Sequence, residues 1–134
     1  IAPNFAKPFI LGVDASDKAI GAVLMQESDG LKRPVCYLSR KLNSHQKRYA
    51  IVEKEAFALL TAVRAFSIYF GSAPTVVYTD HSPLQFMNKM APHNQKLLRW
   101  ALELQQYNLD VRHRAGRDNL LPDILSRPSD QDTT

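Results

Sequence analysis

Four carboxylate side chains stand where a folded chain could bring them together. Asp14 and Asp80 each end an apolar run that is typical of a strand, although Asp also commonly ends strands without any further role. Glu55 lies about 60° from the centre of the apolar stripe of a long amphipathic segment. Asp123 lies in the first turn of a predicted C-terminal helix, where it would also complement the helix dipole.

Carboxylates that gather this closely repel and raise one another's pKa, a conflict that a bound divalent cation removes. Oxygen ligands without thiolates favour Mg²⁺ or Mn²⁺ over zinc. Two such ions about 4 Å apart are the usual arrangement for attack of water on a phosphodiester. The four residues therefore favour metal-dependent hydrolysis of a nucleic acid.

Five strands and three helices are predicted as the elements that position these carboxylates. The predicted strands cover residues 9–14, 20–26, 35–38, 75–80 and 107–113, and the predicted helices are centred on 52–70, 97–104 and 119–126. The first three strands form an antiparallel meander, and the fourth returns through a helical crossover to lie parallel to the first. Asp14 and Asp80 then lie at the same end of neighbouring strands.

The long helix decides which acidic residue faces the site. Asn43 or Ser44 is predicted to cap its start, and Gly71 followed by Pro74 to close it. On this helix Glu53 and Lys54 are expected to point further outward than Glu55. The alternative for Glu55 is a partly exposed carboxylate that passes the edge of the core.

The composition describes one globular domain. The chain has 134 residues, a formal charge of +4, 45% hydrophobic and 22% charged residues, and no apolar run near the length of a spanning helix. The single Cys36 is predicted to be a small buried hydrophobe. Because the chain starts at Ile1 and has no secretory signal, we expect an intracellular piece of a longer product.

Lys and Arg side chains gather in two stretches, residues 32–54 and 96–117, with Tyr37 and Tyr49 between those of the first stretch. This pattern suits a polyanionic partner that is held through its phosphates. An ordinary solvated face is the alternative, because clusters of charge discriminate poorly.

Several short motifs resemble the ribonuclease H domain of gypsy-type LTR retrotransposon reverse transcriptases, from about Phe5 to Arg127. The motifs are Val13-Asp14-Ala15-Ser16, Ile20-Gly21-Ala22-Val23-Leu24 with Gln26, Tyr37-Leu38-Ser39-Arg40-Lys41-Leu42, Tyr49 with Glu53-Lys54-Glu55, Tyr78-Thr79-Asp80-His81 with Leu84, Arg99-Trp100, and Gly116 with Asn119, Asp123 and Leu125-Ser126-Arg127. The resemblance implies an α/β fold of the ribonuclease H type, a five-stranded mixed sheet of order 3-2-1-4-5 flanked by helices.

The resemblance also assigns roles to residues. Asp14, Glu55, Asp80 and Asp123 become the catalytic carboxylates and the ligands of two Mg²⁺ ions, for which Mn²⁺ can substitute. His113 stands where relatives carry a histidine that helps proton transfer or product release, with a surface histidine as the alternative. Pro122 and Ala115 depart from the family pattern, and Pro122 would shift its neighbour Asp123 slightly.

The implied activity is cleavage of the RNA strand of an RNA·DNA hybrid. The expected substrate contacts, chosen by position, are Ser16, Lys18, Ser39, Arg40, Lys41, His81 and Ser82. Residues 1–8 are expected to connect a preceding polymerase domain, residues 9–127 to form the ribonuclease H domain, and residues 128–134 to be a flexible linker, with an integrase often following. No membrane partner is expected, and the setting is the cytoplasm, a virus-like particle or, for a domesticated protein, the nucleus.

Two other readings remain. A non-catalytic domain of this fold, serving a host protein as a connector or a nucleic-acid-binding module, would be expected to lose metal ligands, whereas all four are present. A strand transferase on the related integrase fold carries its essential glutamate late in the chain, whereas Glu55 precedes Asp80.

Overall fold

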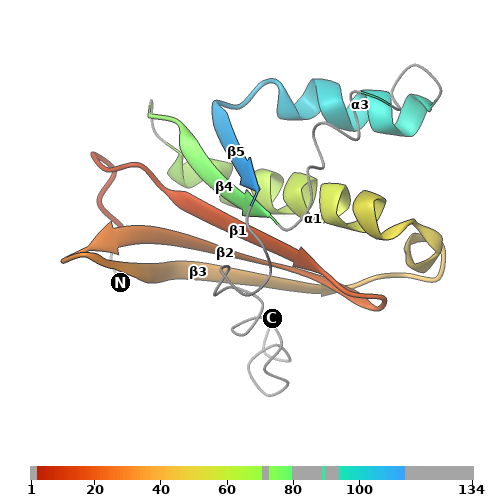
Figure 1. Ribbon diagram of the computed structural model, residues 1–134, viewed down its shortest axis with the longest axis horizontal. Helices are drawn as coiled ribbons and strands as arrows, with labels where there is room; N and C mark the ends of the chain where they lie inside the picture. The colour runs from red at the N-terminus through yellow and green to blue at the C-terminus, as the bar shows by residue number, and fades with distance from the viewer. Residues whose placement is uncertain (1–2, 71–72, 80–88, 90–93, 114–134) are drawn as a thin grey trace.

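Five strands and two longer helices make up the part of the chain that the computed structural model describes, residues 3–70, 73–79, 89 and 94–113 (Figure 1). The strands are β1 (Ile10–Ala15), β2 (Ala19–Ser28), β3 (Leu31–Lys41), β4 (Thr75–Thr79) and β5 (Leu109–His113). The helices are α1 (Ile51–Phe66) and α3 (Gln95–Leu104), with short 3₁₀ helices η1 (Gln46–Arg48) and η2 (Ser67–Tyr69) on either side of α1.

The strands form one sheet in the order β3-β2-β1-β4-β5, as predicted. β1, β2 and β3 pair antiparallel, whereas β4 lies parallel to both β1 and β5. Helix α1 connects β3 to β4 and packs against β1 and β2, which is the helical crossover that parallel strands require. The carboxyl ends of β1, β4 and β5 therefore lie at one edge of the sheet.

The hairpin between β2 and β3 has a two-residue loop, Asp29 and Gly30, with φ of 54° and 78°. Positive φ at both positions is the backbone of a type I′ turn, whose twist matches that of the strands. Ladder pairing continues directly from this turn, since Ser28 is opposite Leu31. β3 is therefore much longer than the predicted strand at 35–38, because pairing with β2 overrides its polar residues.

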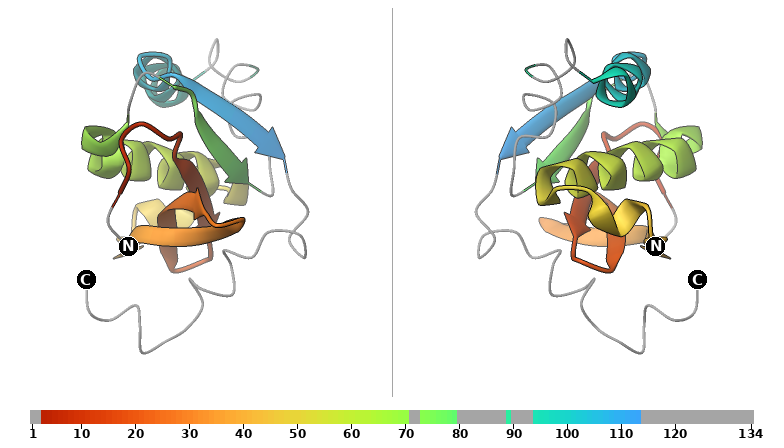
Figure 2. Two further views of the ribbon diagram at one scale, coloured as in Figure 1. Left: turned by 90° about the vertical axis from the view of Figure 1, so that its left-hand side faces the viewer. Right: turned by 90° about the vertical axis from the view of Figure 1, so that its right-hand side faces the viewer.

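The core lies between one face of the sheet and the helices α1 and α3 (Figure 2). Leu11 and Val13 of β1 and Leu59 and Val63 of α1 are almost fully buried there. Trp100 and further α3 side chains extend this core beside α1. A smaller cluster of Ile10, Val23 and Met25 lies on the other face.

The start of α1 differs from the prediction that Asn43 or Ser44 caps it. Asn43 instead makes two reciprocal hydrogen bonds with Gln46 at the start of the 3₁₀ helix η1. Its Oδ1 accepts from the Gln46 N–H at 2.8 Å, and Gln46 Oε1 accepts from the Asn43 N–H at 3.0 Å. The backbone is then extended at Tyr49 and Ala50, and α1 begins at Ile51. The helix also ends earlier than predicted, at Phe66, with η2 following it.

Some predictions lie outside the described residues, namely the helix at 119–126 and the linker at 128–134. Cys36 is half-buried rather than buried, and burial raises the pKa of its thiol. Within the described ranges, no helix has the length and apolar character that crossing a membrane requires.

Candidate catalytic site

Glu55 is a buried carboxylate on the second turn of α1, with 3% of its surface exposed. Its Oε2 accepts a hydrogen bond from Thr79 Oγ1 at 3.2 Å, and Thr79 is the fully buried last residue of β4. The alternative that Glu55 is a partly exposed side chain at the edge of the core is therefore wrong. A buried charge is costly without hydrogen bonds or a cation, so contacts from other parts of the fold must account for the burial of this carboxylate.

Asp14 lies one strand away, near the carboxyl end of β1, where it is opposite Gly21 of β2. The parallel register of β1 and β4 sets Gly12 opposite Tyr78, the residue before Thr79. Both strands therefore run toward the edge at which Thr79 contacts Glu55. The structure brings Asp14 and Glu55 to the same end of the sheet, on a strand and on the helix that covers it.

Four of the predicted site residues lie outside the part of the chain that the structure describes. Asp80 follows Thr79 in the chain and, with Asp123, His81 and Ser82, lies outside the described residues. The backbone of His113 ends β5 opposite Thr79, at the same edge of the sheet. Among the described residues, no three His, Cys, Asp or Glu side chains form a group that could hold a metal ion. The two predicted ligands that are described, Asp14 and Glu55, supply carboxylate oxygens, which suit Mg²⁺.

Lys54 does not point outward as predicted, since only 5% of its surface is exposed. Its Nζ donates a hydrogen bond to the backbone oxygen of Asp17, in the turn between β1 and β2, at 3.2 Å. Glu53 does lie further out, since it is only partly buried. Its carboxylate accepts from the Ala50 N–H and pairs with Lys96 at 2.8 Å. The helical period could not distinguish these neighbours, because the β1–β2 turn lies over the start of α1.

Two of the predicted substrate contacts lie in that turn. Ser16 Oγ accepts from the backbone N–H of Lys18 at 3.3 Å and of Ala19 at 3.2 Å, and the Ser16 N–H donates to the Ala19 oxygen at 2.8 Å. The side chains of Ser16 and Lys18 are exposed. The turn is thus a hydrogen-bonded unit that presents both side chains to solvent directly after Asp14.

Three further predicted contacts end β3, two strands away from Asp14. Ser39 is opposite Gly21, which is itself opposite Asp14, so the three residues form one row across the sheet. Arg40 and Lys41, the other two, are exposed and follow Ser39. The chain therefore gathers these five contact residues from two segments beside Asp14.

An ion pair and two aromatic rings hold the starts of α1 and α3 together. Lys96 Nζ lies 3.9 Å from the ring centroid of Tyr49 and 5.3 Å from that of Trp100, and it pairs with Glu53. Cation–π contacts of a partly desolvated ammonium contribute on the order of 1 kcal/mol. This arrangement joins the first turn of α1 to the first turn of α3.

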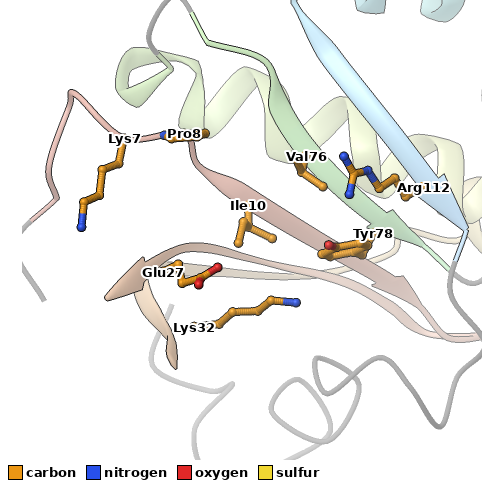
Figure 3. Close-up of a pocket in the computed structure, with 8 residues that line it drawn as sticks. All are labelled: Lys7, Pro8, Ile10, Glu27, Lys32, Val76, Tyr78 and Arg112. Carbon is orange, nitrogen blue, oxygen red and sulfur yellow. The ribbon is translucent and has the colours of Figure 1, made fainter. Parts of the chain in front are cut away.

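A cavity of about 320 Å³ extends from the segment before β1 along β4 to Tyr78 and to Arg112 of β5 (Figure 3). It is lined by Lys7, Pro8, Ile10, Glu27, Lys32, Val76, Tyr78 and Arg112. Lys32 Nζ lies 4.6 Å from the centroid of the Tyr78 ring. None of the predicted site residues lines this cavity, so we place the candidate chemistry at the carboxyl edge and not here.

Comparison with protein families and curated proteins identifies clear relatives. The sequence profile of the family described as an RNase H-like domain found in reverse transcriptase matches residues 4–107. The chain is 43% identical over 126 residues to the retrovirus-related Pol polyprotein from transposon opus of Drosophila melanogaster, covering 93% of the chain and 13% of that protein. It is 38% identical over 133 residues to the transposon Tf2-3 polyprotein of Schizosaccharomyces pombe, covering 96% of the chain and 10% of that protein.

Solved structures share the fold at low sequence identity. The foamy viral protease-reverse transcriptase in complex with RNA/DNA hybrid superposes with a TM-score of 0.68 and 17% identity, over 92% of this chain and 17% of that one. LC11-RNase H1 in complex with RNA/DNA hybrid gives a TM-score of 0.63 and 15% identity, over 87% of this chain and 92% of that one. The predicted α/β fold is confirmed.

Proposed function

Because the chain belongs to the family of RNase H-like domains found in reverse transcriptase, with Pol polyproteins of gypsy-type transposons among its relatives, we propose that it hydrolyses the RNA strand of RNA·DNA hybrids during reverse transcription. One observation carries the proposal beyond family membership. The buried Glu55 carboxylate is held against the end of β4, beside the parallel strand that carries Asp14. A buried carboxylate is costly for stability, and a carboxylate beside the ends of two strands can serve as a ligand of Mg²⁺.

In this proposal Asp14, Glu55, Asp80 and Asp123 hold two Mg²⁺ ions, and Mn²⁺ substitutes for them. The bound ions supply activation of water and stabilisation of the leaving oxygen. Thr79 holds the Glu55 carboxylate in place through its hydroxyl group. His113 transfers a proton or helps product release, and the products carry a 5′-phosphate and a 3′-hydroxyl group.

The hybrid lies with its minor groove over this edge, where 2′-hydroxyl groups distinguish RNA from DNA. Ser16 and Lys18 in the β1–β2 turn and the end of β3 (Ser39, Arg40 and Lys41) contact the backbone, together with His81 and Ser82. Contacts to phosphates set affinity and salt dependence without reading sequence, so cleavage is weakly selective.

The chain spans about an eighth or less of the length of the curated relatives reported above. We propose that residues 9–127 form the nuclease domain, that residues 1–8 connect a polymerase domain, and that residues 128–134 lead toward an integrase. The setting would be that of reverse transcription, the cytoplasm or a virus-like particle.

The test is cleavage of a labelled RNA·DNA hybrid by the chain in Mg²⁺ and then in Mn²⁺. RNA·RNA and DNA·DNA duplexes are the substrate controls, and Asp80→Asn is the protein control. We expect cleavage of the hybrid alone, lost in the variant. A folded chain that binds hybrid tightly in both metals but cuts nothing would instead support a non-catalytic binding module.

A further inference from the structure

Lys54 and Glu55 are the two charged residues that are buried within the described part of the chain, and they are adjacent on α1. Burial of a lysine ammonium is costly, and the start of a helix is an unfavourable place for a cation because the helix dipole is positive there. Neither cost is offset by a carboxylate partner of Lys54 among the described residues. A cation kept in such a place requires an explanation in the contacts that it makes.

The ammonium of Lys54 contacts the β1–β2 turn. An ammonium has three donors, and within the described residues the acceptor for Lys54 is the backbone oxygen of Asp17, 37 positions earlier in the chain. The backbone N–H of Lys54 donates to the Ala50 oxygen at 2.9 Å, the first α-helical bond of α1. Lys54 thus joins the start of α1 to the tip of the turn that follows Asp14.

Adjacent side chains of α1 therefore reach two neighbouring strand ends. Lys54 bonds the turn after β1, and Glu55 accepts from Thr79 at the end of β4. The far side of the turn is also anchored, because the Leu42 N–H donates to the Lys18 oxygen at 2.8 Å. A shift of the turn relative to α1 would change the separation of Asp14 from Glu55.

We propose that Lys54 is a positioning residue, which holds the β1–β2 turn and, through it, Asp14 in register with Glu55 for metal binding. This inference rests on the proposed function, because it assigns to Lys54 the geometry of the same metal site. Lys54 is buried and acts through the backbone of the turn, so it contributes to metal affinity and turnover rather than to affinity for the hybrid. Its methylene groups pack in the protein while its charge serves the contact to Asp17.

The test compares Lys54→Met, which keeps the shape without the charge, with Lys54→Arg, which keeps a donor and the charge. Lys7→Met is the matched control, because Lys7 is exposed at the other end of the sheet. The measurements are amide hydrogen exchange of Ser16, Lys18 and Ala19, the Mg²⁺ concentration for half-maximal cleavage, and kcat and KM for the hybrid.

In Lys54→Met we expect exchange in the turn to accelerate by at least about fivefold, with unchanged exchange in the centre of β1. Half-saturation by Mg²⁺ should rise several-fold and kcat fall about tenfold, with KM for the hybrid nearly unchanged. Lys54→Arg should recover part of each loss. Should Lys54→Met not fold, Lys54→Gln, which is neutral and shorter, is expected to show the same changes.

Wild-type exchange in the turn together with wild-type Mg²⁺ dependence in Lys54→Met would overturn the inference. A rise in KM for the hybrid without any other change would also overturn it, because Lys54 would then be a substrate contact. The proposed function fails separately, if the folded wild-type chain cuts no hybrid in either metal. In that case hydrogen exchange still decides whether Lys54 holds the turn.

Discussion

The two ends of α1 carry charged side chains in opposite circumstances. At its start Lys54 and Glu55 are buried, and their side chains make hydrogen bonds to a backbone oxygen and a hydroxyl group. Near its end Arg64 makes a two-point ion pair with Glu103 of α3, at 2.7 and 2.8 Å, on an exposed surface. The Arg64–Glu103 pair lies on the surface, where pairing contributes least, because water already screens both charges.

This difference shows where burial of charged side chains lowers the stability of the molecule. Buried charges are expensive whenever their pairing is incomplete, and natural chains keep them mainly where a ligand or a catalytic step requires them. The surface pair needs no such explanation, since exposed ion pairs contribute between zero and about 1 kcal/mol. This contrast supports the proposed function, in which the metal site lies at the start of α1, whereas the ion pair at the other end has a structural role.

The comparison is tested most strongly by removing the metal or a predicted ligand. We expect EDTA, or Asp80→Asn in Mg²⁺, to abolish hybrid cleavage while the metal-free melting temperature of the variant is equal to or higher than that of the wild type, because less like charge is crowded together. Cleavage assays and thermal melting check this. A large fall in melting temperature in EDTA would give the carboxylate cluster a structural role instead.

The next test uses neighbouring glutamates on α1. Glu55→Gln should lower cleavage by about three orders of magnitude or more, because an amide is a poor ligand for Mg²⁺, whereas the fold should persist. Glu53→Gln is the matched control and should cleave within about twofold of the wild type, since its amide oxygen can still accept from the Ala50 N–H. The reverse pattern would mean that Glu53 faces the site.

A smaller effect is expected from the hydroxyl group that holds Glu55. Thr79→Val removes the donor without changing the shape of the side chain, and should lower cleavage about tenfold at a stability cost on the order of 1 kcal/mol. Thr79→Ser retains the hydroxyl and is expected to keep most activity. Equal activity of the two variants would show that the hydrogen bond does not orient the carboxylate.

The smallest effect is expected at the exposed end. The hydrogen bond from Arg64 holds the pKa of the Glu103 carboxyl group below its ordinary value. The stabilisation that follows is present above the unfolded-state pKa of Glu, about 4.3, and is lost as the pH falls through the lower folded-state value. Glu103→Gln should therefore cost a few tenths of a kcal/mol at pH 7 and nearly nothing at about pH 2, measured by urea unfolding. A cost above about 2 kcal/mol at pH 7 would remove the contrast between the two ends.

Much of the fold could be predicted because the signals are local. The alternation in β1 and the apolar spacing along α1 identify element types, and the helical crossover predicts that β4 returns parallel to β1 and beside it, as the structure shows. The length of β3 could not be predicted in this way. Its polar residues pair with β2 from a type I′ turn, and pairing partners are not visible in the period of one strand.

The candidate site was likewise predicted only in part. Asp14 and Glu55 could be selected from their places at a strand end and a helix face, and the structure sets both at one edge of the sheet. Thr79 was missed, although its position directly before Asp80 at the end of a strand was an available signal. The prediction that Lys54 points outward was wrong, because a helical period gives the direction of a side chain on an isolated helix and not what packs over it.

The sequence by itself determined the kinds of elements, because these depend on residue types at short, regular spacing. Its motifs determined the family resemblance, which implied the order of the strands in the sheet. Only the tertiary structure decided that Lys54 is buried, where α1 begins, and which hydroxyl group meets Glu55. These outcomes depend on contacts between residues such as Asp17 and Lys54 that are far apart in the chain. Burial and pairing of a charge are properties of such long-range contacts, and no local pattern contains them.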